Sequence, residues 1–383
     1  MTATPSNSPG PSDSAADVVV RVVGRTDVGR TREHNEDAFA VADLAALRDP
    51  DAQPYEHIHR DDEQRVIAGG ALFIVADGMG GAAAGEIASS MAVDVVIREV
   101  AERWRKAERC DAETFATALR AATSAANARI HEFATQHPEY RGMGTTATVA
   151  ALLGNTLFLA QVGDSRAYIV RDGVARQITK DQSLMQKLIE AGEITVEEAE
   201  VSDRRNIILQ ALGPEAFVKV DLTHQPVRRG DTLILCSDGL SGQVRGDEIA
   251  RVVAEERDLE RACQRLIDSA NASGGPDNIT VVAARFDGVG LEAAGSDDEV
   301  GHRIFPMGAD DTPVLPVERY VRRSMPSPAA RRAQGPADDG TGAPGADQEL
   351  AMPVRRAVPL PWMIALLLVL AVALAYTLLQ LRT

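Results

Sequence analysis

Short apolar runs and long amphipathic stretches alternate along the first three quarters of the chain. Between residues 18 and 78, three runs rich in Val, Ile and Phe predict β-strands. Residues 85–104 and 112–136 place apolar side chains three and four positions apart, which predicts two helices. Apolar runs resume between residues 146 and 179, separated by GN, GDS and DG turns that are typical of hairpins.

The rest of this region adds further helical stretches and strands. A helical pattern covers residues 184–200, and strand patterns lie at 217–227, 231–240 and 278–287, with two more helices before the last of them. Hairpin turns link the strands in place of βαβ crossovers. The pattern therefore predicts an α+β fold, a central antiparallel β-sandwich flanked by helices, over residues 18–287.

Composition changes outside this predicted domain. Residues 1–17 have no basic start and no apolar core, which predicts a disordered tail and no signal peptide. Residues 288–357 are rich in Pro, Ala, Gly and Asp and are expected to form a linker. Residues 358–379 carry no charge over about 22 positions, roughly 33 Å of helix, which predicts a single transmembrane helix before a short tail at 380–383.

The charges beside the predicted span indicate its orientation. Arg355 and Arg356 precede the span and only Arg382 follows it, so the positive-inside rule places the large N-terminal part in the cytoplasm. The chain is then expected to be a tail-anchored, single-pass membrane protein. The alternative interpretation is an apolar helix packed on the domain.

Overall charge and cysteine content narrow the function classes. Lys and Arg total 40 against 56 Asp and Glu, giving a formal net charge of -16, which argues against a nucleic-acid partner. An acidic chain can still bind divalent cations. The three cysteines lack CxxC spacing, which argues against a zinc site or a disulfide framework and fits a reducing compartment.

Aspartates recur where apolar strands begin or end. Asp77, Asp164, Asp238 and Asp277 each stand at such a point, next to glycine or another small residue. Carboxylates that converge from strand ends would repel one another unless a cation neutralised them. Oxygen donors without nearby Cys or His favour magnesium or manganese over zinc, and the carbonyl of Gly78 could also approach an ion.

Such a cluster suits phosphoryl transfer. Two cations that share one carboxylate can hold and deprotonate a water, which supplies a hydroxide nucleophile. In the stretch TREHNEDAF, Arg32 offers a planar fork that matches two phosphate oxygens. Glu36 and Asp37 could hold metal-bound waters. Taken alone, this stretch also fits a solvated turn with a surface ion pair.

Seven stretches together resemble the metal-dependent, type 2C serine/threonine protein phosphatases in their bacterial form. They occur in the family's order across residues 24–287, as TREHNEDA, FIVADGMGG, GMGTTATVA, QVGDSRAY, TKDQSL, LCSDGL and GGPDNIT. The resemblance implies a central β-sandwich with helices on both outer faces and a two-metal centre in a cleft at one end. It also implies hydrolysis of phosphoserine and phosphothreonine in proteins by a metal-bridged hydroxide.

The resemblance assigns the metal ligands residue by residue. Asp77 would bridge two manganese or magnesium ions, and Gly78 would contribute its carbonyl. Asp238 and Asp277 would be ligands of one ion. Asp164, with Asp238, would match a third, weaker site that is found in bacterial members.

The remaining catalytic positions follow from the same resemblance. Glu36 and Asp37 would contact metal-bound waters, and Arg32 would bind the substrate phosphate. Met79 replaces a histidine that is thought to protonate the leaving group in many eukaryotic relatives, and methionine cannot donate that proton. The general acid is therefore unassigned. Residues 183–212 correspond to the family's flap beside the active site.

The partners expected are phosphorylated proteins and a serine/threonine kinase at the same membrane, with the enzyme itself a monomer. Three alternatives stay open: a catalytically silent phosphoprotein-binding module, a membrane sensor or scaffold, and hydrolysis of small phosphate esters. Intact Asp77, Asp238 and Asp277 argue against a silent module. His57 and His59 are interpreted as part of an exposed hairpin tip, and Cys236 as a small core residue.

Overall fold

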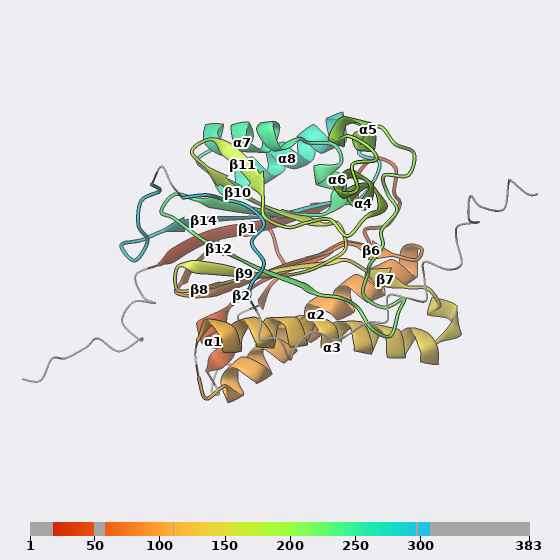
Figure 1. Ribbon diagram of the computed structural model, residues 1–383, viewed down its shortest axis with the longest axis horizontal. Helices are drawn as coiled ribbons and strands as arrows, with labels where there is room; N and C mark the ends of the chain where they lie inside the picture. Colours follow the sequence, from red (N-terminus) through yellow and green to blue (C-terminus); the bar gives the residue numbers. More distant parts are fainter. Residues whose placement is uncertain (1–17, 50–57, 110, 296–297, 307–383) are drawn as a thin grey trace, which may run out of the picture. The chain divides into compact units, whose positions relative to one another are not determined.

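The computed structural model describes residues 18–49, 58–109, 111–295 and 298–306, all within a first compact unit, Met1–Thr312 (Figure 1). Two six-stranded antiparallel sheets form its centre. Sheet A contains, in spatial order, β11 (Val174–Gln177), β10 (Arg166–Arg171), β13 (Thr232–Cys236), β14 (Ile279–Asp287), β1 (Val19–Asp27) and β4 (Arg65–Ala68). Sheet B contains β12 (Asp221–Pro226), β9 (Thr156–Val162), β8 (Ala147–Leu153), β5 (Ala71–Ala76), β2 (Ala38–Asp43) and β3 (Ile58–His59).

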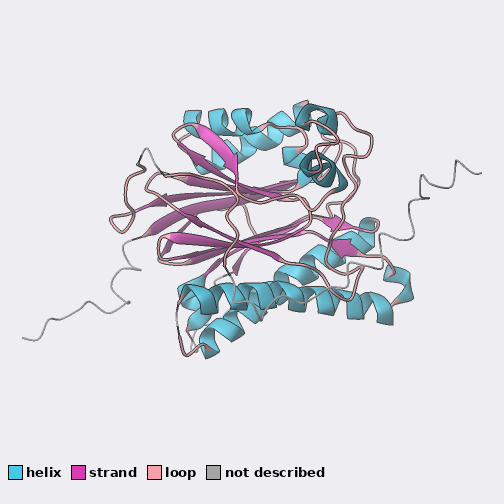
Figure 2. Cartoon of the chain, in the orientation of Figure 1, coloured by secondary structure: helices cyan, strands magenta, loops and turns pink. Residues whose placement is uncertain are grey.

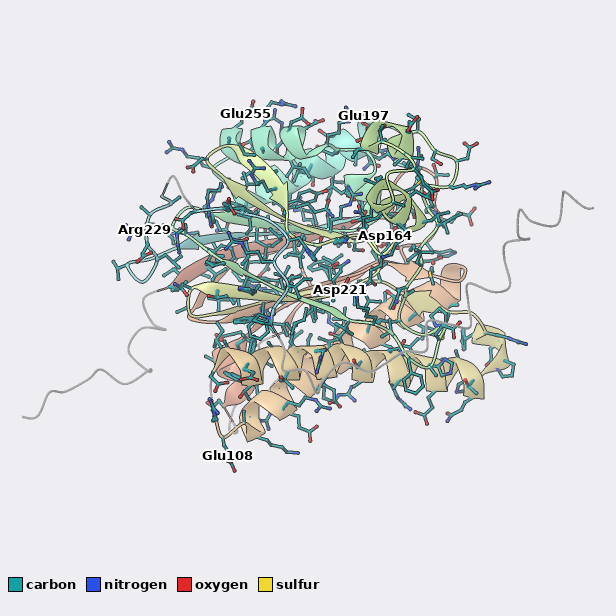
Figure 3. All side chains as sticks on the ribbon, viewed as in Figure 1. Glu108, Asp164, Glu197, Asp221, Arg229 and Glu255 are labelled. Atoms are coloured by element: carbon teal, nitrogen blue, oxygen red, sulfur yellow. The ribbon has the colours of Figure 1, made fainter. Side chains whose placement is uncertain are left out.

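Helices cover the outer face of each sheet, as Figure 2 shows. Helices α2 (Ala82–Lys106) and α3 (Ala112–Gln136) pack on sheet B, and α7 (Gly246–Glu255) and α8 (Leu259–Ala272) pack on sheet A. The shorter elements are α1 (Leu44–Arg48), β6 (Gly78–Met79), a 3-10 helix (Pro138–Tyr140), β7 (Gly144–Thr145), α4 (Leu184–Glu190), α5 (Val196–Glu200) and α6 (Asp238–Ser241). Charged side chains such as Glu108, Glu197 and Glu255, labelled in Figure 3, lie exposed on the outside.

Strand β5 shows why this architecture produces continuous apolar runs. Its alternate residues Phe73 and Val75 face the core between the two sheets. Leu72 and Ile74 point the other way and pack beneath the helices that cover sheet B. Successive side chains of a strand point to opposite faces, so a strand that is covered on both faces has no polar position.

The sequence-based fold class is confirmed for the described residues, which form an α+β sandwich with helices on both outer faces. The predicted tail at 1–17 and the predicted membrane span at 358–379 lie outside these residues. Within the part of the chain that the structure describes, no helix is both long and apolar enough to cross a bilayer. His59 lies in β3, and His57 is outside the described residues.

The chain continues past β14 along the side of the sandwich. We call residues 288–295 and 298–306 the C-terminal strap. Leu291 of the strap is 1% exposed and joins the core between the sheets, and Val300 packs against the same core. The backbone N–H of Arg229 donates to the carbonyl of Glu292 at 2.9 Å. The strap is therefore packed as part of the domain.

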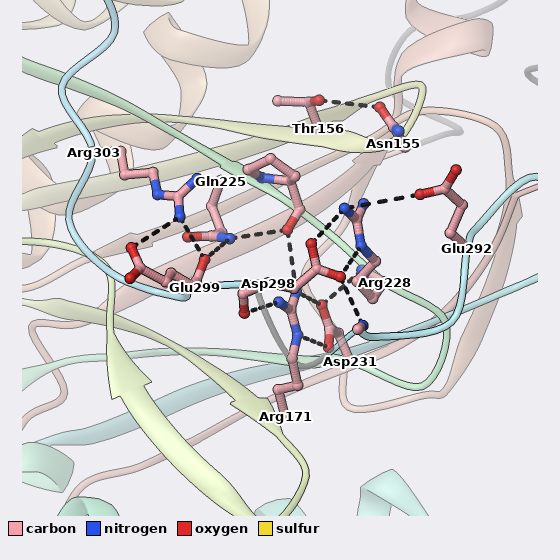
Figure 4. Close-up of polar contacts among 12 residues, drawn as sticks. Asn155, Thr156, Arg171, Gln225, Arg228, Asp231, Glu292, Asp298, Glu299 and Arg303 are labelled. Atoms are coloured by element: carbon pink, nitrogen blue, oxygen red, sulfur yellow. Dashed lines mark hydrogen bonds and ion pairs between the residues drawn. The ribbon is translucent and has the colours of Figure 1, made fainter.

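A cluster of ion pairs fastens the middle of the strap (Figure 4). Arg228 donates twice to the Asp298 carboxylate, at 2.7 Å each. These hydrogen bonds hold the pKa of Asp298 well below its ordinary value. Arg171 donates to the Asp298 carbonyl at 3.0 Å and also forms a buried ion pair with Asp231. Bidentate pairs of this kind fix the geometry of both partners.

The end of the strap covers one edge of sheet B. Strand β12 is one of the two edge strands of this sheet. The His224 N–H donates to the Arg303 carbonyl and the Phe305 N–H donates to the Leu222 carbonyl, each at 2.9 Å. The Phe305 ring packs edge-to-face on Phe158, with ring centroids 5.5 Å apart. The strap thus satisfies backbone groups that an uncovered edge strand would expose.

Shortening the buried strap residue Leu291 to alanine should destabilise the domain. Leu291→Ala is expected to lower the free energy of unfolding by about 2–4 kcal/mol, because it leaves a cavity in the core between the sheets. Val289→Ala is the matched control, since Val289 is 80% exposed on the same segment. Urea unfolding of both variants measures the difference. Equal, small effects would contradict the packing of the strap.

Candidate active site

The predicted carboxylates gather at one end of the sandwich. Asp77 follows the last residue of β5, Asp238 comes two residues after β13, and Asp277 lies two residues before β14. Asp164 lies in the turn between β9 and β10. Because neighbouring strands are antiparallel, the end of one and the start of the next meet at the same edge.

Threonines of the GMGTTATVA stretch hold the backbone of Asp77. Thr146 donates its N–H to the Asp77 carbonyl at 2.8 Å, and its hydroxyl accepts from the Asp77 N–H at 2.9 Å. The Thr145 hydroxyl also donates to the Asp77 carbonyl, at 2.9 Å. Neither threonine was assigned a role from the sequence. The paired TT directly after a glycine-rich turn was the available signal.

Glycines bring Glu36 close to the strand that carries Asp77. A Cβ at Gly78 would lie 2.4 Å from the Glu36 carbonyl oxygen, and one at Gly85 would lie 2.0 Å from its carboxylate. Any larger side chain at either position would displace Glu36. The backbone N–H of Glu36 donates to the Asn278 side chain at 2.8 Å, which links this loop to the start of β14.

Asp37 and Asp164 both carry a buried carboxylate oxygen without a hydrogen-bond donor from the protein. In each residue this atom is Oδ1. Burial raises the pKa of Asp37 to about 7, although the Ser237 hydroxyl donates to its other oxygen at 2.8 Å. Burial, followed by repulsion from Asp238, raises the pKa of Asp164 to about 7.

Asp77 lies at the electrostatic centre of the cluster. Burial is the largest cause of its raised pKa, and repulsion from Asp37, Asp238, Asp164 and Asp277 adds to it. Burial also raises the pKa of Asp238, with Asp277 as the next cause, while a hydrogen bond with Asp77 partly offsets the increase. Grouped carboxylates with these shifts are typical of functional sites.

The donor chemistry fits hard divalent cations. Carboxylate oxygens predominate, two of them lack a protein donor, and the carboxylates raise one another's pKa, a cost that a cation would remove. The side chains of the described residues do not already place three acidic, histidine or cysteine donors around one point. The predicted ligands are thus brought together, but their assignment to individual ions, and that of the Gly78 carbonyl, stays a prediction.

Arg32 and Asp277 meet at the entrance to the cluster. A guanidinium N–H of Arg32 donates to the Asp277 carboxylate at 2.8 Å. The Arg32 side chain is half exposed, so its other N–H groups are open to an incoming anion. The sequence predicts a phosphate-binding role for Arg32 and a metal-ligand role for Asp277, and the structure places the two side chains in direct contact.

Two further positions can be judged from their surroundings. Cys236 is fully buried at the end of β13, and burial raises the pKa of its thiol to about 12, which confirms its interpretation as a core residue. Met79 lies in the short strand β6, where a Cβ added to Gly144 would come within 2.8 Å of its methyl group. Met79 therefore contributes packing beside the cluster.

Comparisons with known proteins agree with this geometry. The family model described as Protein phosphatase 2C matches residues 55–280. Serine/threonine phosphatase stp of Listeria monocytogenes is 38% identical over 264 residues, which cover 69% of this chain and 94% of that protein. Serine/threonine protein phosphatase PstP of Mycobacterium tuberculosis is 41% identical over 228 residues, covering 59% of this chain and 42% of PstP.

Solved structures give the same result. The crystal structure of the M. tuberculosis phosphatase PstP/Ppp has a TM-score of 0.57 and 36% identity, covering 72% of this chain and 99% of that one. The PstP catalytic domain in complex with two manganese ions has a TM-score of 0.55 and 35% identity, covering 70% of this chain and 99% of that one. The chain belongs to the protein phosphatase 2C family.

Proposed function

We propose that this protein is a metal-dependent serine/threonine protein phosphatase that hydrolyses phosphoserine and phosphothreonine in proteins. The observation that carries the proposal is the convergence of Asp37, Asp77, Asp164, Asp238 and Asp277 at the strand ends of a protein phosphatase 2C fold. The stp and PstP relatives are named as serine/threonine phosphatases, which supports this substrate class.

The residues have separate tasks in this reaction. Asp77, Asp238 and Asp277 would hold two manganese or magnesium ions, with Asp164 serving a third, weaker site. When bound, such ions neutralise phosphate charge and make water a stronger nucleophile at neutral pH. Arg32 binds and orients the phosphate through N–H groups that remain exposed to solvent. The exposed position of Arg32 suits a phosphate carried on a protein surface.

We also propose that residues 358–379 anchor the enzyme to a membrane, with the phosphatase domain in the cytoplasm. The proposal rests on the uncharged length of this segment and on Arg355 and Arg356 before it. A serine/threonine kinase at the same membrane would supply the phosphorylated substrates. The proposed enzyme acts as a monomer.

Replacing Asp238 by asparagine should abolish turnover while the fold is retained. Phosphate release from a phosphothreonine peptide, with manganese, is expected to fall by about 100-fold or more, since replacing residues that merely support metal ligands already costs 10–100-fold. Asp247→Asn is the matched control, because Asp247 is exposed at the start of α7. Near-normal release by Asp238→Asn would contradict the metal-site mechanism. A folded wild-type protein that binds the peptide without releasing phosphate would indicate the binding module.

Metal affinity should increase with pH through neutrality. The pKa values of Asp37 and Asp164 are raised to about 7, so both carboxyls bind protons below that pH, and a cation must displace them. By the same shift, protein stripped of metal should lose stability as pH rises from about 4 to about 7, because in that range these carboxyls are ionised in the unfolded chain and still protonated in the folded one.

Calorimetric titration of chelator-treated protein with manganese measures this effect. The affinity should increase from pH 6 to pH 8, with protons released on binding that are detected by comparing buffers of different ionisation enthalpy. Thermal unfolding of the metal-free protein at each pH tests the predicted loss of stability. An affinity that does not change with pH, with no proton release, would show that these carboxyls are already ionised.

Removing the proposed anchor should release the enzyme from membranes. A chain that ends at residue 357 is expected in the soluble fraction with full phosphatase activity, because the strap and the site precede the deletion. Deleting residues 1–17 is the control and should leave membrane association unchanged. Fractionation of expressing cells, followed by carbonate washing, distinguishes the outcomes. A membrane-bound chain 1–357 would reject the anchor.

A further inference from the structure

The TKDQSL stretch, residues 179–184, joins β11 to α4. Its glutamine, Gln182, is only 9% exposed and lies directly before the flap, residues 183–212. Its backbone N–H and carbonyl and both ends of its side-chain amide all form hydrogen bonds. A buried amide with every group satisfied fixes the segments that it joins.

The first segment is the turn that carries Asp164. The Gln182 N–H donates to the Gly163 carbonyl at 2.9 Å, and the Gly163 N–H donates to the Gln182 side-chain oxygen at 3.0 Å. Gly163 has a φ of 100°, and a Cβ there would lie 2.6 Å from the Thr146 side chain. Because Thr146 also holds the Asp77 backbone, this turn is packed directly against the catalytic cluster.

The second segment is strand β12, at the edge of sheet B. The Gln182 side-chain nitrogen donates to the Asp221 carboxylate at 3.1 Å and to the Lys219 carbonyl at 3.3 Å. Figure 3 labels Asp164 and Asp221 in the central part of the domain, between the helical layers. A single side chain therefore bridges the Asp164 turn and the edge of sheet B.

The third segment is the flap. The Gln182 carbonyl accepts from the Leu209 N–H at 2.8 Å, and Ser183 pairs with Ile208 in an antiparallel bridge. These contacts join the two sides of the flap at its base. The flap then ends at Leu212, which exchanges hydrogen bonds of 2.8 and 3.1 Å with Thr145.

We propose that Gln182 is a positioning residue that fixes the base of the flap and the Gly163–Asp164 turn to each other. The flap and the turn therefore do not adjust independently: a displacement at the flap base moves the Asp164 backbone, and the reverse holds. Only the predicted effect on peptide hydrolysis rests on the proposed phosphatase function. The coupling itself is a property of the fold.

Gln182→Ala removes the side-chain bonds and leaves the backbone in place. Amide hydrogen exchange of the full-length protein should then accelerate by about tenfold or more at Gly163, Leu184 and Leu209, because the turn and the flap base open together. Core amides such as that of Val149 should keep their rates. Gln186→Ala is the matched control: Gln186 lies on α4, and its side-chain amide donates to Glu190 within the flap at 2.9 Å.

Exchanging the amide and the carboxylate between Gln182 and Asp221 tests their hydrogen bond without the cavity that alanine would leave. Gln182→Glu keeps an acceptor for the Gly163 N–H but loses the donor to Asp221 and adds a like charge. Combining it with Asp221→Asn restores a donor and an acceptor in reversed order. Exchange at Gly163 and Leu209 should be fast in Gln182→Glu and slow again in the double variant, which gives a coupling free energy between the two residues.

Kinetics supply a second readout. With manganese saturating, Gln182→Ala should lower kcat/KM for a phosphothreonine peptide by about tenfold, the smaller end of the loss of activity that follows when a residue supporting a metal site is replaced. Acceleration at Gly163 alone, with flap amides unchanged, would overturn the proposal, and so would uniform acceleration that includes Val149. If no variant, the wild type included, hydrolyses the peptide, the proposed function fails while the exchange data still test the coupling.

Discussion

Repulsion among like charges is the constraint on which this structure depends. Five aspartates, Asp37, Asp77, Asp164, Asp238 and Asp277, are held near one end of a sandwich although each is more stable when separated and hydrated. A chain can hold such a group only if its backbone is fixed by other interactions. The cores between and outside the two sheets supply that rigidity, and a divalent cation supplies the missing charge.

The site is therefore supported largely from behind, by neutral groups. Thr145, Thr146 and Ser237 fix the backbones and side chains of the acidic residues through hydrogen bonds of 2.8 to 2.9 Å. Neutral hydroxyls hold the carboxylates without neutralising them. The charge of the cluster thus remains available to cations, whereas a ring of arginines around it would have competed with them. Arg32 contacts the cluster only at its entrance.

The sequence predicted those features that depend on residues near one another in the chain, such as buried strands and the aspartates at their ends. Strand β5 was visible because both of its faces are buried, and Asp77 was visible because it interrupts that apolar run. The hydrogen bonds from Thr146 to Asp77 and from Gln182 to Asp221 were not visible, because they join residues 69 and 39 positions apart. A hydrogen bond between residues that are distant in the sequence leaves no periodic pattern by which it could be predicted.

The packing of the C-terminal strap was not predicted from the sequence, for a different reason. Its segment is poor in large apolar residues, and composition alone predicted a linker from residue 288 onward. Its attachment depends on a few isolated apolar side chains, such as Leu291 and Phe305, and on the Arg228 pair with Asp298. A composition averaged over many residues does not reveal single apolar side chains of this kind. The predicted limits of the linker beyond residue 306 stay a prediction.

The cover that the strap gives to β12 has a consequence for the behaviour of the protein in solution. The family match ends at residue 280, well before the segment that pairs with this strand. A chain that ends with β14, at residue 287, would keep every strand of both sheets but would present the outer backbone groups of β12 to any extended segment of a neighbouring molecule. The shortened chain would then associate with itself edge to edge at high concentration. In the complete domain the strap occupies this edge and prevents such pairing.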